Sequence, residues 1–275
     1  MRRKLEAVAL HALVIAAAVL TAAPLLWMVS ASFMRAGAAT SSPPPLLPAS
    51  HTATLEHYRA LFTSQSLGRY LLNSLVIAGG GTLLGVAITA MAGYGFAKLR
   101  FRGRDPLFRN LVLLMVVPGQ VAMLPMFLEL RELGLINTLF GAMIPVLAPI
   151  YGVFLVRQYA LSIPGDLLDA ARIDGASELR IFRSIVLPTI APVLVTLGVF
   201  TFLSAWNDFM WPLIVLSDDA RYTLPVALAN LAGEHVQDTE LMMSGAVVTV
   251  LPVFLAFLFL QRYYIQGIMA GSTKG

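Results

Sequence analysis

Charge and cysteine are the two things that this sequence has least of. Of its 275 residues, 12% are Asp, Glu, Lys or Arg, against ~25% in an ordinary soluble domain. A soluble protein of this length would need more polar surface, so the composition points to a membrane protein. The absence of cysteine excludes disulfides and metal sites built on thiolates.

The chain also lacks the short motifs of common catalytic and nucleotide-binding sites. Its four histidines are scattered without an HExxH motif, and there is no GxSxG motif. The glycines at 79–81 are not followed by Lys-Ser or Lys-Thr at the Walker spacing and lie inside a hydrophobic run, which favours helix packing over a phosphate loop. We therefore predict no catalytic, cofactor or metal site in this chain. An intramembrane hydrolase built from dispersed Ser and His is the remaining enzymatic alternative.

Six runs without Asp, Glu, Lys or Arg are each long enough to cross a hydrocarbon core, which takes about 20 apolar residues as a helix. They are 7–34, 70–97, 110–128, 133–156, 184–207 and 241–261. The runs are continuous rather than alternating, which favours helices over a β-barrel. We expect an all-α membrane protein with one transmembrane domain, residues 1–275. Its six helices should span roughly 8–30, 70–96, 107–128, 136–156, 189–210 and 241–262. The first is expected to be retained rather than cleaved as a signal peptide.

The basic residues divide unequally between the two sides of the membrane. With a cytoplasmic N-terminus, the inner segments hold fourteen Lys and Arg residues and the outer segments hold five. This positive-inside bias predicts that both termini are cytoplasmic. The net charge of +4 is then a topology signal and not a nucleic-acid footprint. Residues 31–69 become an outer segment, with an extended proline-rich stretch at 41–48 and a short amphipathic helix at 55–62. Residues 158–187 become a cytoplasmic loop.

Two features inside the spans bear on packing and transport. Gly81, Gly85, Thr89 and Gly93 recur every four residues, which lets a neighbouring helix approach closely. Pro118 and Pro125 in the third helix, and Pro145 and Pro149 in the fourth, should kink or interrupt both. Interrupted helices favour a transport pathway over an inert bundle, although simple bending is the alternative.

The polar stretch Asp169–Pro188 separates two hydrophobic runs, and local rules predict two short helices around a turn. Pro164 suits the first position of the first helix, since it has no N–H to leave unsatisfied. Gly175 can take the left-handed conformation that closes this helix, and Ser177 can cap the second. The apolar faces should be Leu167, Leu168 and Ala171, followed by Leu179, Phe182 and Val186.

The same stretch resembles the cytoplasmic EAA loop of bacterial ABC-importer permeases of the maltose type. The family pattern is Glu-Ala-Ala, three residues, Gly, nine residues, Ile, one residue, Leu-Pro. The residues at those spacings are Asp169, Ala170, Ala171, Gly175, Ile185, Leu187 and Pro188. Only the first position departs, because aspartate stands for glutamate; this keeps the charge and shortens the side chain. Weaker similarities at 55–62, 73–74 and 204–213 extend the resemblance to sugar-importer permeases over 55–275.

The resemblance implies a permease of type I ABC-importer architecture, which forms half of the pathway for a sugar delivered by an extracytoplasmic binding protein. The implied partners are a second related permease, two ATPase subunits that hold ATP and magnesium, and that binding protein, in the bacterial inner membrane. ATP hydrolysis is then expected in the partner subunits and not in this chain. The implied ATPase-coupling residues are Asp169, Ala170, Ala171, Asp174, Gly175, Leu187 and Pro188.

Alternatives remain open for the solute and for the mechanism. Within the family, glycerol 3-phosphate or a glycerophosphodiester could replace the sugar. Outside it, an ion-coupled secondary transporter would show an internal repeat and ionisable residues near the midplane, and neither is found. Asn73, Gln120 and Asn207 are the candidates for lining the pathway. Asp208 could serve ion coupling, or it could lie in an interfacial aromatic belt with Trp206 and Trp211.

Overall fold

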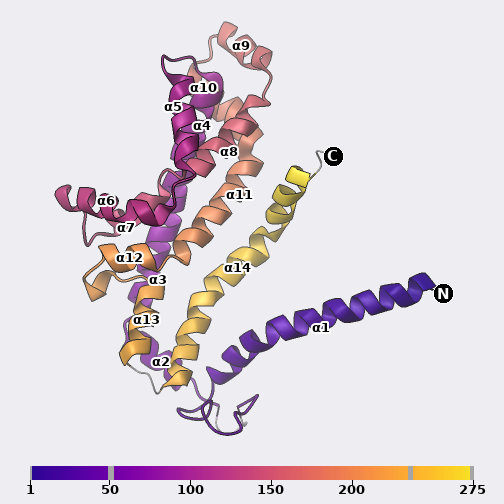
Figure 1. Cartoon of the computed structure of the whole chain (residues 1–275), viewed down its shortest axis with the longest axis vertical. Coiled ribbons are helices and arrows are strands. Elements are labelled where there is room, and N and C mark those ends of the chain that lie inside the picture. The colour runs from indigo at the N-terminus through magenta and orange to yellow at the C-terminus, as the bar shows by residue number, and fades with distance from the viewer. Residues whose placement is uncertain (1, 49–52, 235–237, 273–275) are drawn as a thin grey trace. The chain divides into compact units, whose positions relative to one another are not determined.

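The computed structural model describes residues 2–48, 53–234 and 238–272, and every regular element within these ranges is a helix. In chain order the α-helices are α1 (Arg2–Ala31), α2 (Glu56–Thr63), α3 (Leu67–Leu75), α4 (Gly81–Lys98), α5 (Arg104–Leu114), α6 (Gly119–Glu132), α7 (Leu139–Met143), α8 (Ile150–Leu161), α9 (Gly165–Ile173), α10 (Glu178–Ile181), α11 (Leu187–Trp206), α12 (Met210–Val215), α13 (Leu224–Glu234) and α14 (Thr239–Ser272) (Figure 1). Short π- and 3₁₀-helical turns complete them: η1 (Val76–Gly80), η2 (Ile144–Val146), η3 (Phe182–Val186) and η4 (Asp219–Arg221).

The helices long enough to cross a membrane agree with the predicted spans. In the described residues, four continuous helices qualify by length and composition, and the total is six when each of two bent helix pairs is counted as one span. The continuous ones are Glu6–Ala31, Leu67–Lys98, Glu178–Trp206 and Thr239–Leu258. The prediction of an all-α membrane protein with six transmembrane helices is confirmed.

Proline interrupts the two spans in which the sequence predicted a break. The pair α5 and α6 is bent by 110°, and Pro118 stands immediately before α6. The pair formed by α7–η2 and α8 is bent by 47°, and Pro149 stands immediately before α8. Because proline cannot donate to the preceding turn, each break falls where a new helix begins. Pro125, by contrast, lies inside α6 without ending it.

The chain divides into two compact units, which we describe separately: unit 1 is Met1–Gly68 with Ala227–Phe254, and unit 2 is Arg69–Val226 with Leu255–Gly275. In unit 2, the small residues of α4 pack against α8 and the turn before it. A Cβ on Gly85 would lie 2.3 Å from the backbone oxygen of Val146, and one on Gly93 would lie 2.5 Å from Cγ1 of Val156. No side chain fits at such distances, so the predicted close helix packing is confirmed.

An apolar core fills the part of unit 2 that holds α4, α8, α9, α10 and α11. Its buried members are Ala90, Tyr94, Ala97, Val156, Ala160, Ile163, Leu168, Ile181, Val186, Ile190, Val193 and Leu197. Within unit 2, α9 lies at one end of the helices and α12 lies towards the other (Figure 1). At the α9 end of unit 2, the short helices α9 and α10 therefore rest on a buried apolar core.

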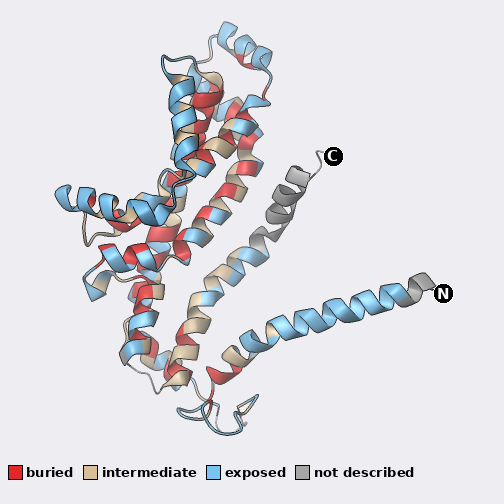
Figure 2. Cartoon of the chain, viewed as in Figure 1, coloured by how far each residue is buried: buried red, intermediate tan, exposed pale blue. Residues whose placement is uncertain are grey.

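Unit 1 contains α1, the segment that follows it through α2, most of α13 and the first part of α14. Most side chains of α1 from Glu6 to Leu26 are exposed, whereas Ser30 and Ala31 at its C-terminal end are buried (Figure 2). A helix that is apolar all round and exposed in the isolated chain faces lipid or another subunit. The predicted short amphipathic helix at 55–62 is present as α2, with His57 and Leu61 buried.

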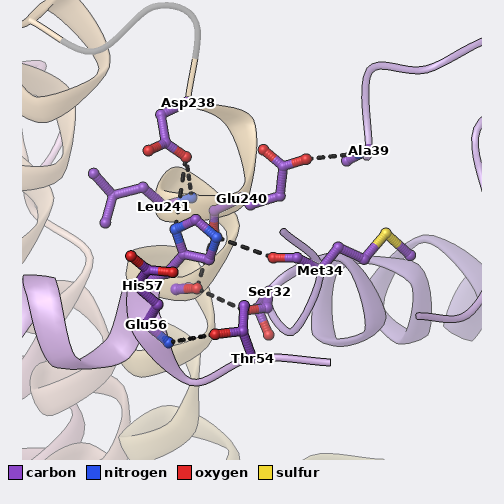
Figure 3. Close-up of polar contacts among 10 residues, drawn as sticks. Ser32, Met34, Ala39, Thr54, Glu56, His57, Asp238, Glu240 and Leu241 are labelled. Carbon is purple, nitrogen blue, oxygen red and sulfur yellow. Dashed lines mark hydrogen bonds and ion pairs between the residues drawn. The ribbon is translucent and has the colours of Figure 1, made fainter. Parts of the chain in front are cut away.

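Polar contacts connect α2 and the segment between α1 and α2 to the start of α14 (Figure 3). His57 Nε2 donates to the carbonyl of Met34 at 2.9 Å, and its Nδ1 lies 3.8 Å from a carboxylate oxygen of Asp238. The fully buried Glu240 accepts a hydrogen bond from the N–H of Ala39 at 2.6 Å. Unit 1 is therefore a defined structure and not a loose connection between spans.

Candidate functional site

The segment between α8 and α11 folds as a helix, a turn and a second helix start. Pro164 stands directly before α9, one position earlier than predicted. Gly175 follows with φ of +81°, in the left-handed region that favours glycine, as predicted. Ser177 precedes α10, and its hydroxyl accepts a hydrogen bond from the N–H of Arg180, so the predicted cap is also present.

The prediction of two short helices in Asp169–Pro188 was wrong for the second helix, because that helix is continuous with the fifth span. The elements α10, η3 and α11 form one continuous helix from Glu178 to Trp206. Pro188 lies at the start of α11, directly after the π-helical turn η3. Wider π turns already depart from the regular hydrogen-bond ladder, so a proline without an N–H is accommodated there. The fifth span consequently begins well before the predicted residue 189.

One face of α9 and α10 packs into the core of unit 2. Leu168 and Ile181 are each 1% exposed and lie in the same cluster as Val156 and Ile163. The predicted apolar faces are thus partly right: Leu168 and Val186 are buried and Phe182 is half-buried. Since the buried face belongs to both helices, the segment is held firmly at the end of the bundle.

The opposite face presents apolar side chains to the outside. Ile173 is 87% exposed, and Leu167 and Leu179 are 48% and 56% exposed. The candidate residues Asp169, Ala170, Asp174, Gly175 and Pro188 are exposed, whereas Ala171 and Leu187 are half-buried. These three exposed apolar side chains are the candidates in this segment for contact with another protein.

A chain of ion pairs and hydrogen bonds crosses the base of this segment. The Arg172 guanidinium donates to Asp169 at 2.6 Å and to Glu178 at 2.7 Å. Glu178 also accepts a hydrogen bond from the hydroxyl of Tyr94, in α4, at 2.7 Å. The hydrogen bonds to Glu178, and then to Asp169, raise the pKa of Arg172 further above its ordinary value. The sequence analysis did not predict these contacts, although the three-residue spacing of Asp169 and Arg172 on one helix was a signal for the first ion pair.

Basic residues at the same end fix the neighbouring helix termini. Lys98 Nζ donates to the carbonyls of Leu161 at 3.2 Å and Ile163 at 2.6 Å, which caps the C-terminal end of α8. The guanidinium of Arg157 lies 4.1 Å from the ring centroid of Phe108. The Lys98 hydrogen bonds attach the entry to α9 to the ends of α4 and α8, and the Arg157 contact joins α8 to α5.

The three candidate pathway residues lie in different elements. Asn73 is buried, and its amide donates to the carbonyls of Ala220 and Tyr222, each at 3.0 Å. Asn207 is exposed and donates to Leu203 at 2.8 Å, within its own helix end. Gln120 is exposed near the start of α6. None of the hydrogen bonds assigned to Asn73 and Asn207 joins them to each other, and a pathway role for the three stays a prediction.

The aromatic residues near Asp208 do not form an interfacial belt. Trp206 and Trp211 are each 1% exposed, and Trp211 Nε1 donates to the carbonyl of Gly141 at 3.1 Å. Burial raises the pKa of the Asp208 carboxyl, and hydrogen bonds from the backbone N–H groups of Trp211 and Met210 oppose this shift. These tryptophans therefore pack inside the protein, and Asp208 stabilises the start of α12.

Proteins with similar sequences are membrane components of transport systems. The profile of a family described as "Binding-protein-dependent transport system inner membrane component" matches residues 81–269. The arabinooligosaccharides transport system permease protein AraQ of Halalkalibacterium halodurans is 35% identical, over 92% of this chain and 91% of its own. The lactose transport system permease protein LacG of Rhizobium radiobacter is 30% identical, over 100% and 98%.

A solved structure supports the fold. It is the crystal structure of a bacterial ABC transporter involved in the import of the acidic polysaccharide alginate, and the match has a TM-score of 0.83. The match covers 95% of this chain and 97% of that chain at 22% sequence identity. This chain therefore has the same fold as that chain of the alginate transporter.

Proposed function

The chain belongs to the family of binding-protein-dependent transport system inner membrane components, and from this premise we propose that it passes a neutral di- or oligosaccharide inwards as one half of an ATP-driven pathway. The observation that carries the proposal is the exposed face of α9. It stands on a buried base and presents Ile173, Asp169 and Ala170 outside the spans. A partner that moves α9 would move the bundle on which it rests.

The energy for transport comes from separate subunits. The sequence contains no P-loop, so ATP binding of that kind falls to two ATPase subunits, and α9 is the element that docks on them. Asp169 would contact the ATPase, the small Ala170 and Ala171 would allow close approach, and Gly175 would set the turn. Asp174, Leu187 and Pro188 would hold the segment at the correct angle. Closure of the ATPases on ATP would then shift α9 and open the pathway outwards.

The remaining partners follow from the same mechanism. A second, related permease would complete the pathway, and an extracytoplasmic binding protein would deliver the solute. The N- and C-termini would lie in the cytoplasm, on the side of α9, as the positive-inside bias indicates. Residues 1–275 would then act as one transmembrane permease domain whose cytoplasmic loop, 158–187, carries the docking surface.

A neutral sugar fits the spans better than an anionic solute. The six uncharged runs offer no Lys or Arg to pair with a phosphate, which glycerol 3-phosphate or a glycerophosphodiester would require. The relatives named for arabinooligosaccharides and lactose point in the same direction. The same lack of ionisable residues argues against ion-coupled secondary transport.

The docking role of α9 is tested by giving its most exposed apolar residue a charge. Ile173→Asp is expected to weaken co-purification of the ATPase subunits roughly tenfold or more, since an anchor residue contributes at least ~1.4 kcal/mol. Folding should be unaffected, because Ile173 is 87% exposed. Leu47→Asp is the matched control, since Leu47 is 75% exposed in the segment predicted to lie outside. Equal ATPase recovery with both variants would argue against docking through α9.

A further inference from the structure

Glu178 is the residue at which three structural elements meet. It is the first residue of α10, and its two carboxylate oxygens are used separately. One accepts from Arg172 of α9 at 2.7 Å, and the other accepts from the hydroxyl of Tyr94 of α4 at 2.7 Å. We propose that Glu178 is a positioning residue that makes α9 and the cytoplasmic end of α4 move as one body. This rests on the proposed function, in which α9 docks on an ATPase.

The apolar core alone does not fix this relation. Contacts of Leu168 and Ile181 with the core are non-directional, so the helices could slide or rotate while keeping them. Hydrogen bonds are directional and weaken steeply when their angle changes. Tyr94 is 4% exposed, and its ring lies 5.5 Å from that of Phe182, so its hydroxyl is itself held in place. The pair Tyr94–Glu178 therefore sets the register between α4 and the helix that follows α9.

Arg172 and Glu178 are partly exposed, which argues that their contact mainly fixes the relative position of α9 and α10 and adds little to stability. The side chains of Arg172 and Glu178 are 36% and 47% exposed, and ion pairs in contact with solvent add little to stability. In the apolar core below, by contrast, removal of a side chain would lower stability directly. We call the connected residues Asp169, Arg172, Glu178 and Tyr94 the relay. Its contacts have a fixed geometry and a small stabilising effect, which suits the transmission of movement from α9 to α4.

Asp169 connects the relay to the surface on which the ATPase is proposed to dock. Its carboxylate is 66% exposed and shares Arg172 with Glu178. When an ATPase engages Asp169, Arg172 keeps Glu178 as its acidic partner in this chain of contacts. The Arg172 guanidinium therefore connects the ATPase-docking residue Asp169 to Glu178, which contacts α4. From α4, the movement reaches η2 through the tight contact at Gly85 and α8 through the tight contact at Gly93.

The test uses the assembled importer, with spin labels on this chain. The sequence has no cysteine, so Arg100→Cys, just beyond α4, and Asp166→Cys, in α9, supply the only two labels on it. The distance between them is measured without nucleotide and after trapping with ATP and vanadate. With the native relay, we expect the same distance in both states. With Glu178→Ala and with Tyr94→Phe, we expect the distance to shift between the states while the complex still assembles and hydrolyses ATP.

Controls separate this result from a general loss of structure. Asp105→Asn removes a comparable exposed ion pair, Arg104–Asp105, within α5 alone and should behave as the native chain does. Glu178→Gln keeps an oxygen that accepts from Arg172 and supplies an NH2 group that can donate to the Tyr94 hydroxyl, so it should restore most of the native behaviour. If Glu178→Ala does not assemble, Tyr94→Phe, which removes one oxygen atom, carries the test.

Two outcomes would overturn the inference while leaving the proposed function intact. One is a state-dependent distance in the chain with the native relay, and the other is an unchanged distance in both relay variants. A native chain that assembles with no ATPase would overturn the proposed function and the inference together.

Discussion

Valine in place of Gly175 is expected to lower ATPase association roughly tenfold while leaving membrane insertion intact. Gly175 has φ of +81°, and a left-handed conformation costs other L-residues about 1–2 kcal/mol, most of all a β-branched one. No atom lies within 4 Å of a Cβ at this position, so the effect is one of backbone conformation and not of crowding. Relief of the strain would turn α9 away from its docking angle. Co-purification of the ATPase subunits measures the effect.

Two substitutions serve as controls for Gly175→Val. Asn tolerates the left-handed region, so Gly175→Asn should retain most of the association. Gly134 is also left-handed, with φ of +68° and open space around a Cβ, but it lies between α6 and α7 and not near α9. Gly134→Val should therefore leave ATPase association unchanged. Normal association of Gly175→Val would contradict the role given to this turn.

Alanine in place of Gly85 is expected to destabilise the fold by about 1–3 kcal/mol, as overpacking usually does. The new Cβ would lie 2.3 Å from the backbone oxygen of Val146, which cannot move as a side-chain tip could. Helix α4 and the turn η2 that precedes α8 would have to separate. Gly95→Ala is the matched control on the same helix, because nothing lies within 4 Å of its Cβ. Thermal unfolding in detergent should show a lowered midpoint for Gly85→Ala alone; equal midpoints would contradict the close packing.

The sequence predicted those features that depend on local chemistry or on composition. Uncharged runs identified the spans, because charged side chains are rare within the hydrocarbon core and most costly at its centre. Pro118 and Pro149 marked the breaks, since a missing N–H acts within one helix turn. Gly175 and Ser177 were recognised for the same reason, as a turn and a cap involve only neighbouring residues.

Features that depend on distant partners, or on a local departure from regular α-helix geometry, were not predicted. Continuity through Pro188 requires the π-helical turn before it, which no proline rule anticipates. The burial of Trp206 and Trp211 depends on residues far along the chain, such as Gly141. The same holds for Glu178, because its partner Tyr94 is 84 residues away. Tertiary contacts of this kind leave no periodic signal in one sequence.

Reconstitution into proteoliposomes tests the central claim most directly. The chain would be assembled with its second permease and two ATPase subunits, with the binding protein outside and ATP inside. Uptake of radiolabelled lactose and of an arabinooligosaccharide would be compared with uptake of glycerol 3-phosphate. We predict that at least one sugar enters, only when ATP and every subunit are present. Uptake by this chain alone, without ATP and under an ion gradient, would contradict the account.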